Sequence, residues 1–228
     1  MKIDKVFIIN LKNRLDRKKQ VIKELQRVKF DNYEFFRAIK PHDKMVEEWC
    51  DKYIDPLPQW FINSGKNPNK YRCGALGCLM SHYEIIKISK ERGYKNVLIL
   101  EDDSKFEIKD GETFLEKFES YSSQINQIEN VYGLLYLVGN HCPIPQTKKQ
   151  VSQNLVLTRH TLTTGSYIIS ERAMDLVLEN IKGYKKEIDV FYIEYIQQKL
   201  PCFFIYPHLA GQVSSYSDIA QRDVNYNL

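Results

Sequence analysis

The first part of the chain alternates short apolar runs with segments whose apolar side chains recur at helical spacing. Residues 6–9 form a β-branched and aromatic run that ends at Asn10, and apolar residues then recur at helical spacing between Leu15 and Val28. Residues 33–39 form a second strand-like run. This order predicts a strand, an amphipathic helix and a second strand, joined as a right-handed β-α-β unit.

The rest of the chain continues this alternation. Residues 76–91 carry apolar side chains along one helical face, and Gly93 follows as a stop signal. Residues 96–100 are continuously apolar, as expected of a strand buried on both faces of a sheet. Further helices are predicted near residues 112–128, 171–181 and 189–199, and further strands at residues 134–138, 155–157, 165–170 and 202–206. The pattern predicts one α/β domain over residues 1–228, with a mostly parallel central sheet flanked by helices.

Residues 41–71 interrupt the alternation. Prolines and a glycine punctuate this stretch, which also holds the aromatic residues Trp49, Trp60, Phe61 and Tyr71. A long loop inside a compact domain is more often functional than accidental. We therefore expect an aromatic-rich loop insertion that closes over an active site, with simple packing of the rings as the alternative.

Composition narrows the class of protein. The chain has 228 residues, 43% of them apolar, with 33 basic and 29 acidic side chains and a formal charge of +4. This nearly balanced charge argues against a dedicated nucleic-acid binder. No apolar run approaches the length of a membrane span or of a signal peptide, and the five scattered cysteines do not suggest a disulfide framework. These features favour a cytoplasmic location.

The sharpest chemical motif is the acidic triplet Glu101-Asp102-Asp103, which ends the buried strand at residues 96–100. Ligands of open α/β sheets bind at the carboxyl ends of strands. Three adjacent carboxylates there repel one another unless a cation or hydrogen-bond donors compensate. Mg²⁺ or Mn²⁺, which prefers oxygen ligands and often bridges to phosphates, suits such a site. The alternative is a solvated acidic turn in which Asp103 caps the following segment.

Other predicted strand and helix ends carry polar groups or glycines. Asn10, Arg14 and Arg17 follow the first strand, where an amide can read a base edge and guanidinium groups can reach phosphate. The helix that follows the aromatic loop begins near a pair of glycines, a serine and a histidine lie one turn further into that helix, and a threonine-glycine pair opens a later strand. Each has a structural alternative, namely a solvated helix face, tight helix packing, a core histidine beside the serine, or ordinary β-propensity. The residues concerned are Gly74, Gly77, Ser81, His82, Thr164 and Gly165.

Taken together, these segments resemble glycosyltransferase family 25, which includes lipopolysaccharide-type and collagen-modifying galactosyltransferases. The matching segments occur in order and span nearly the whole chain. They are residues 8–11 with Arg14 and Arg17, residues 74–78 with Ser81-His82, residues 98–103, residues 164–170 with Ala173, Ile188-Asp189, residues 206–208 and residues 217–219.

The resemblance implies a single Rossmann-like domain of the GT-A type, a UDP-sugar donor, Mn²⁺ (or Mg²⁺) and an inverting mechanism. By position, the triplet corresponds to the D-x-D metal motif, with Glu101 in place of the first aspartate and Asp103 favoured as the metal ligand. His208 is the candidate that completes the metal site, although a structural role explains it equally well. The expected donor-binding residues are Asn10, Leu11, Arg14, Arg17, Gly74, Ala75, Gly77, Ser81, Thr164 and Gly165.

An inverting transfer also needs a base that removes the proton of the acceptor hydroxyl. Asp189 is the first candidate, because its apolar neighbours at residues 188–191 could raise its pKa, and Asp102 is the second. Helix N-capping is the structural alternative for Asp189. The expected reaction moves a hexose, galactose or glucose, to a hydroxyl of a glycan or glycosylated protein. The alternatives are a noncatalytic nucleotide-sugar or carbohydrate-binding module and, less favoured, a metal-dependent phosphoesterase or nuclease.

Overall fold

The computed structural model describes all residues except 43, 46–47, 49–56, 143 and 225–228. The strands are β1 (Lys5–Asn10), β2 (Tyr33–Arg37), β3 (Asn96–Glu101), β4 (Ser104–Phe106), β5 (Leu134–His141), β6 (Lys148–Gln150), β7 (Leu155–Thr158), β8 (Thr161–Ser170), β9 (Cys202–Ile205), β10 (Ala210–Gln212), β11 (Ser215–Ser217) and β12 (Arg222–Val224). The helical segments are α1 (Leu15–Arg27), α3 (Gln59–Ile62), α4 (Pro68–Glu91), α5 (Phe114–Glu119), α6 (Ser122–Ile125), η1 (Pro145–Thr147), α7 (Glu171–Asn180), α8 (Ile188–Phe191), η2 (Tyr192–Ile196) and α9 (Gln197–Lys199).

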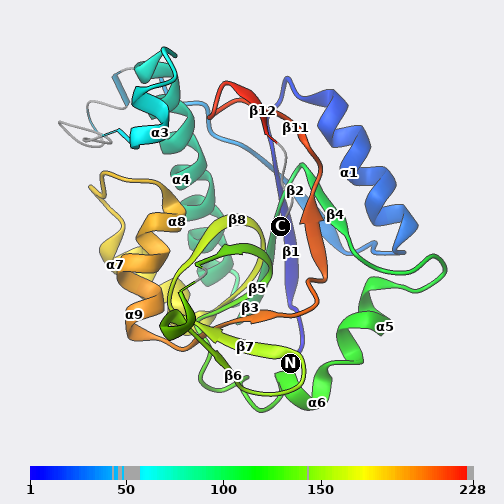
Figure 1. The fold of residues 1–228 in the computed structure, drawn as a ribbon. Helices are drawn as coiled ribbons and strands as arrows, with labels where there is room; N and C mark the ends of the chain where they lie inside the picture. Colours follow the sequence, from blue (N-terminus) through cyan, green and yellow to red (C-terminus); the bar gives the residue numbers. More distant parts are fainter. Residues whose placement is uncertain (43, 46–47, 49–56, 143, 225–228) are drawn as a thin grey trace.

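The central sheet has eight strands in the order β2-β1-β3-β8-β5-β9-β7-β6 (Figure 1). Three pairings are parallel (β1 with β2, β1 with β3, β5 with β9) and four are antiparallel. The predicted α/β fold is confirmed, but the sheet is mixed rather than mostly parallel. Parallel neighbours need a long, usually helical crossover. Among the described residues between β5 and β8, the only helical segment is the short η1, which is too short for a crossover. Strands β6, β7 and β8 accordingly run antiparallel to the strands that they pair with.

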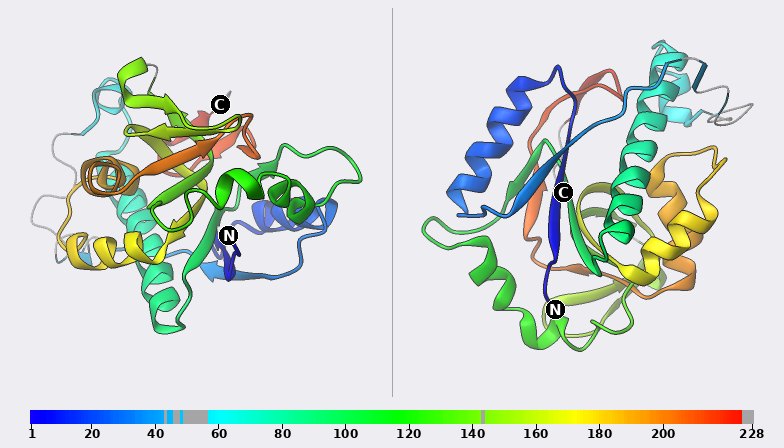
Figure 2. Two further views of the ribbon diagram at one scale, coloured as in Figure 1. Left: turned by 90° about the horizontal axis from the view of Figure 1, so that it is seen from below. Right: turned by 180° about the vertical axis from the view of Figure 1, so that it is seen from behind.

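Two apolar cores cover the two faces of the sheet. The first packs against α1, α5 and α6, and the second packs against α4, α7, α8 and η2 (Figures 1 and 2). Successive side chains of a strand point to opposite faces. Val6 and Ile8 of β1 therefore join the first core and Phe7 joins the second, while in β3 Leu98 joins the first and Ile99 the second. This two-sided burial explains the continuous apolar runs in the sequence.

Some predicted element boundaries are wrong. The predicted helix at residues 112–128 is two shorter helices, α5 and α6, and a capping box from Thr113 to Glu116 starts the first of them. The stretch predicted as a loop over residues 41–71 includes α3 and the first turn of α4. Asn67 caps α4 with its side chain and Pro68 occupies the first helical turn, a start signal that the proline and glycine content obscured. Trp49 lies outside the described residues.

Two small two-stranded antiparallel sheets lie beyond the central sheet. Strand β10 pairs antiparallel with β4, the strand that directly follows the acidic triplet. This pairing places Gln212 opposite Ser104, the first residue after Asp103. The backbone N–H of Val213 donates to the carbonyl of Asp103 at 2.7 Å. Strands β11 and β12 form the second pair. The C-terminal part of the described chain is thereby fixed beside the end of β3.

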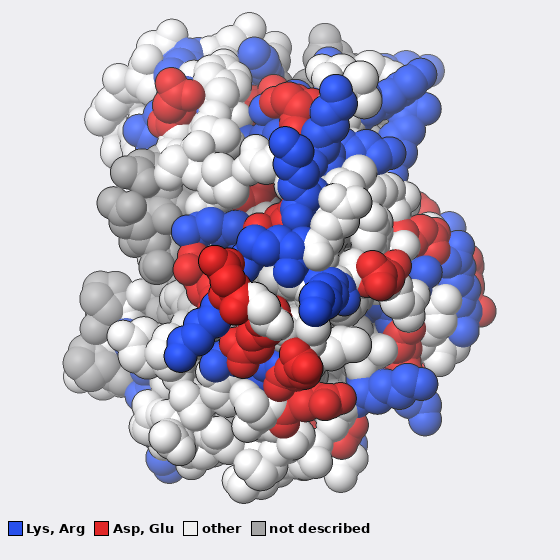
Figure 3. Space-filling view, turned by 90° about the vertical axis from the view of Figure 1, so that its right-hand side faces the viewer, with Lys and Arg blue, Asp and Glu red and all other residues white. Residues whose placement is uncertain are grey.

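The surface described by the structure carries mixed charge. On the face shown in Figure 3, Lys and Arg side chains are interspersed with Asp and Glu side chains. Ion pairs such as Arg27 with Glu24 account for part of this mixture. Among the described residues, no helix combines the length and apolar character that crossing a bilayer requires.

Candidate functional site

The strand alternation of β3 separates the first two carboxylates of the triplet. Glu101 faces His82 of α4, and its Oε1 accepts a hydrogen bond from Thr164 Oγ1 of β8 at 2.9 Å. Asp102 faces α1 and is held by two donors, Asn10 Nδ2 at 2.8 Å and Arg17 Nη1 at 2.9 Å. The predicted acidic cluster is therefore not a solvated turn, because Asp102 is buried and its oxygens are hydrogen-bonded.

Asp103 is buried next to the other two acids of the triplet, and its side chain faces β10. Gln212 Nε2 donates to its Oδ1 at 3.2 Å, and Arg17 Nη1 lies 3.4 Å from its Oδ2. Burial and the nearby charge of Glu101 raise the pKa of Asp103 to about 7. The Oε1 atom of Gln212 is buried and has no hydrogen-bond partner among the described residues. Asp103 and Gln212 are thus adjacent side chains that carry oxygen atoms, the ligand type that a hard divalent cation prefers, although Gln212 directs its Nε2 rather than its Oε1 to Asp103.

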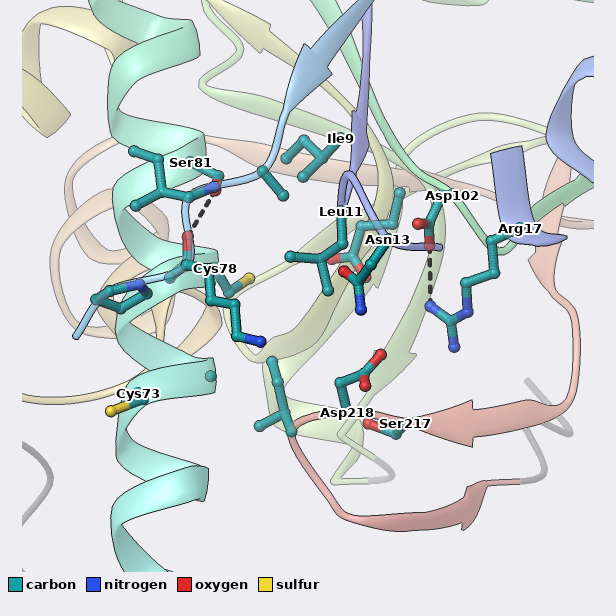
Figure 4. Close-up of a pocket in the computed structure, with 18 of the residues that line it drawn as sticks. Ile9, Leu11, Asn13, Arg17, Cys73, Cys78, Ser81, Asp102, Ser217 and Asp218 are labelled. Carbon is teal, nitrogen blue, oxygen red and sulfur yellow. Dashed lines mark hydrogen bonds and ion pairs between the residues drawn. The ribbon is translucent and has the colours of Figure 1, made fainter. Parts of the chain in front are cut away.

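A first cavity of about 280 Å³ opens on the triplet between β1, β3 and α4 (Figure 4). All three acids of the triplet line it. The predicted donor-binding residues that also line it are Leu11, Arg17, Gly74, Gly77 and Ser81. Ser81 also has a structural role, because its Oγ accepts from Ile39 N at 2.9 Å and donates to the carbonyl of Gly77 at 2.6 Å. Three further polar lining residues, Asn13, Lys40 and Lys70, were not predicted, because none of them belongs to a recognisable motif.

A second cavity of about 240 Å³ adjoins the first. It is lined by Asp189, Ala75 and Thr164 among the predicted residues, and by the rings of Trp60 and Tyr71. Both cavities are lined by Cys78, Glu101, Ser217 and Ile219, so they meet at the end of β3. The described part of the aromatic stretch thus contributes Trp60 and Tyr71 to the site, whereas Phe61 is buried in a small core.

Asp189 lies in the first turn of α8 and is held by backbone donors. Its Oδ2 accepts from Thr163 N at 3.0 Å and its Oδ1 from Val190 N at 2.9 Å. Burial raises the pKa of the Asp189 carboxyl above its ordinary value, and the charge of Glu187 adds to the shift. Thr163 itself has a φ of 70°, in the left-handed region that β-branched residues rarely adopt. The position that caps α8 is Glu187, so Asp189 is not the N-cap residue.

Four predicted residues do not line either cavity. Asn10 is buried and orients Asp102, and Arg14 pairs with Asp16 and with Asp218. A side chain at Gly165 would meet Gln212 at 2.8 Å, so this glycine makes room for Gln212.

His208 is the fourth of these residues and lies away from the triplet. Its Nε2 is 2.9 Å from that of His141. It precedes Gln212 by four residues, about 13 Å along an extended chain. Gln212, rather than His208, is therefore the C-terminal polar side chain that the structure places beside Asp103.

The β11–β12 hairpin lies between α1 and the start of α4 (Figure 1), and its residues Ser217, Asp218 and Ile219 line the first cavity. Arg17 Nη2 donates to Ser215 Oγ and to the carbonyl of Tyr216, both at 2.8 Å. On the other side, Gln221 Nε2 donates to the carbonyl of Asn67 at 2.9 Å. The hairpin therefore supplies a wall of the cavity and fixes the guanidinium group that pairs with Asp102.

Comparison with known proteins identifies related sequences. The sequence model of glycosyltransferase family 25 (LPS biosynthesis protein) matches residues 3–192. Procollagen galactosyltransferase 2 of Homo sapiens is 28% identical over 96% of this chain and 37% of its own length. Procollagen galactosyltransferase 1-A of Xenopus laevis is 28% identical over 78% of this chain and 28% of its own length.

A viral protein is related at the same level. Procollagen lysyl hydroxylase and glycosyltransferase of Acanthamoeba polyphaga mimivirus is 28% identical over 74% of this chain and 18% of its own length. The chain therefore matches between 18% and 37% of the length of these three relatives.

Proposed function

Because the chain belongs to glycosyltransferase family 25, we propose that it is a metal-dependent, inverting hexosyltransferase that uses a UDP-sugar. The acceptor in this proposal is a hydroxyl of a glycan or of a glycosylated protein. The observation that carries the proposal is the meeting of two cavities at Glu101, one lined by the acidic triplet and the other by Asp189. A donor and an acceptor placed in these cavities approach each other at the end of β3.

The first cavity suits the nucleotide diphosphate. Lys40, Lys70 and Arg17 bring positive charge to its lining, while Gly74 and Gly77 let Ile219 and the segment at Ile39 approach α4 closely and form parts of its wall. Arg17 is already paired with Asp102 and Asp103, so it does not compensate a diphosphate on its own. An additional cation resolves this charge balance.

The residues around Asp103 fit Mn²⁺ or Mg²⁺. The buried carboxylate of Asp103 is a hard oxygen donor that would hold the ion, with Glu101 close by, and Gln212 would add its unpartnered Oε1 if its amide, which now directs Nε2 to Asp103, turned over. Gln212 takes the place that the sequence assigned to His208. When bound, such an ion offsets the negative charge that grows on the leaving diphosphate.

In the second cavity, Asp189 acts as the base. Its carboxylate accepts the proton of the acceptor hydroxyl while that oxygen attacks the anomeric carbon from the side opposite the diphosphate. The N–H groups of Thr163 and Val190 fix the carboxylate, and its raised pKa brings it closer to the working range of a base. Trp60 and Tyr71 offer ring surfaces for a sugar. Asp102, the second candidate base, does not line this cavity.

Galactose is the first choice of sugar, because two of the relatives are named as procollagen galactosyltransferases. Glucose remains the second choice. The unit proposed to carry the activity is the single domain of residues 1–228, in which Trp60 and Tyr71 of the 41–71 segment line the second cavity and Pro41 and Lys70 line the first.

The proposal is tested by mixing the protein with Mn²⁺ and, in turn, UDP-galactose, UDP-glucose and UDP-N-acetylglucosamine, and measuring UDP release. We expect release from one donor, and its loss after chelation of the metal. Tight binding of a sugar nucleotide with no hydrolysis and no transfer would identify a noncatalytic binding module instead. Cleavage of DNA or of a phosphomonoester in place of the sugar nucleotide would indicate a phosphoesterase or nuclease.

A further inference from the structure

Three side chains of different chemistry converge where the two cavities meet. Cys78 Sγ, His82 Nε2 and a carboxylate oxygen of Glu101 all lie within 4.8 Å of one another. Cys78 and His82 are four residues apart in α4, so they lie on the same face of the helix. Glu101 reaches them because the alternation of β3 directs it towards α4. Both Cys73 and Cys78 line the first cavity, but Figure 4 shows the Cys78 sulfur directed towards Leu11 and the Cys73 sulfur directed to the opposite side of α4.

His82 presents an unpartnered nitrogen to this cluster. The imidazole is fully buried, and its Nδ1 lies 2.7 Å from the hydroxyl of Tyr167. Its Nε2 has no hydrogen-bond partner among the described residues, because Glu101 Oε1 is 3.9 Å away. A hydrogen bond from Nδ1–H to Tyr167 leaves the lone pair on Nε2, and this arrangement is typical of metal-binding histidines. Tyr167 in turn contacts the hydroxyl of Tyr192 at 2.7 Å, which fixes its orientation.

We propose that Cys78, His82 and Glu101 form a binding site for a Zn²⁺-type transition-metal ion, separate from the oxygen ligands at Asp103. Thiolate, imidazole and carboxylate are the three ligand types that zinc prefers, and three protein ligands leave one coordination position open. Cys78 and Glu101 line both cavities, so the open position faces the cavity space and takes water or a ligand group. Binding breaks the S–H bond of Cys78, forms a sulfur–metal bond and releases the proton to solvent.

The ligand set also predicts selectivity. Sulfur and imidazole ligands favour Zn²⁺ and Co²⁺ over Mn²⁺, which stands at the weak end of the affinity series for divalent metals. The site therefore binds Zn²⁺ at concentrations at which Mn²⁺ does not compete. The site shares Glu101 and the junction of the two cavities with the proposed transferase centre, but metal binding itself requires only the fold and these three side chains, so its test does not depend on transferase activity.

The test uses the full chain, stripped of metal, reduced and kept free of oxygen, and titrates it with Co²⁺. We expect a sulfur-to-cobalt charge-transfer band in the near ultraviolet, together with the strong visible bands of four-coordinate Co²⁺. One equivalent of Zn²⁺ should bleach these bands and excess Mn²⁺ should not. Cys78→Ser should remove the charge-transfer band, and His82→Gln should weaken Co²⁺ binding at least tenfold.

Cys73→Ser is the matched control, since it removes a neighbouring thiol of α4 that points away from the cluster, and the band should persist. A band that survives in Cys78→Ser, or its absence in the wild-type protein, would overturn the proposal. If the variants fail to fold, X-ray absorption of the Zn²⁺-loaded wild-type chain decides the matter. One sulfur ligand supports the site and a shell without sulfur refutes it.

Discussion

At the scale of single residues, the two proposed roles at the site belong to carboxylates in different surroundings. Asp189 is held by backbone N–H groups and lines the second cavity, whereas Asp103 is buried against Gln212 and Arg17. Burial raises the pKa of both groups, although their hydrogen-bond partners differ. Substitutions at these two positions should therefore have separable effects on proton transfer and on metal-dependent binding.

Asp189→Asn should suppress transfer while leaving donor binding nearly unchanged. The amide oxygen of asparagine still accepts from Thr163 N, but it does not take up the proton of the acceptor. We expect the rate of sugar transfer or donor hydrolysis to fall by about 10²- to 10⁴-fold. Calorimetry with UDP and Mn²⁺ should give an affinity close to that of the wild-type protein. Asp110→Asn, at a side chain that is 99% exposed, is the control. Transfer at a near wild-type rate would assign the base to another residue.

Asp103→Ala should abolish the Mn²⁺-dependent part of UDP binding without unfolding the protein. The side chain is a proposed metal ligand and packs at a strand end rather than in an apolar core. The Asp103 carboxyl has a pKa of about 7 in the folded protein, above its ordinary value, so keeping it ionised at pH 8 lowers the free energy of unfolding. Replacing the side chain with alanine removes this cost. Calorimetry of UDP with and without Mn²⁺, with circular dichroism as the check on folding, measures both effects. Unchanged UDP affinity in Mn²⁺ would refute the assignment.

At the scale of elements, α4 shows how closely the site depends on helix packing. A β-carbon at Gly77 would lie 2.5 Å from the carbonyl oxygen of Ile39, which is a backbone atom. A β-carbon at Gly74 would meet the side chain of Ile219 at 3.1 Å. The first contact requires the backbone after β2 to move, while the second requires only a small side-chain adjustment.

Gly77→Ala should therefore destabilise the protein by about 1–3 kcal/mol. Gly74→Ala should be neutral or slightly stabilising, since alanine favours a helix over glycine by about 1 kcal/mol. Urea unfolding of the two variants measures the difference, and each variant serves as the control for the other. Equal stability of both would show that the segment around Ile39 moves away without cost.

Much of the element order could be predicted from the sequence, because buried strands and amphipathic helices leave strong periodic signals. The end of β3 and its acidic triplet were located in this way, as were Gly74 and Gly77 beside the first cavity. The mixed sheet was not predicted, because strand direction depends on pairing between distant segments. Gln212 was missed for the same reason, since only the β4–β10 pairing brings it to Asp103.

At the scale of the whole molecule, stability should depend on pH through the buried imidazole of His141. Its ring stacks on Phe204 at 3.6 Å and contacts His208, and burial lowers its pKa to about 3. The unfolded chain binds a proton at this residue below about pH 6.5, whereas the folded chain does not. The contribution of His141 to stability is therefore complete above pH 6.5 and decreases as the pH falls below it, by up to about 2 kcal/mol at pH 5.

Urea unfolding at pH 7.5 and pH 5 measures this loss. His141→Gln should be less stable than the wild-type protein at pH 7.5 but should lose less stability between the two pH values. His160→Gln, which removes an imidazole outside the stacked pair, should retain the wild-type dependence. An equal loss in His141→Gln and in the wild-type protein would assign the pH dependence to other groups.

The β11–β12 hairpin has a consequence for how the protein is made. Ribosomes synthesise a chain from its N-terminus, and segments fold in that order as they emerge. The acidic triplet, the glycines of α4 and Asp189 all precede the hairpin, which supplies Ser217 and Ile219 to both cavities. A nascent chain can thus complete most of its sheet before this wall arrives. The first cavity is then completed only after this hairpin has folded.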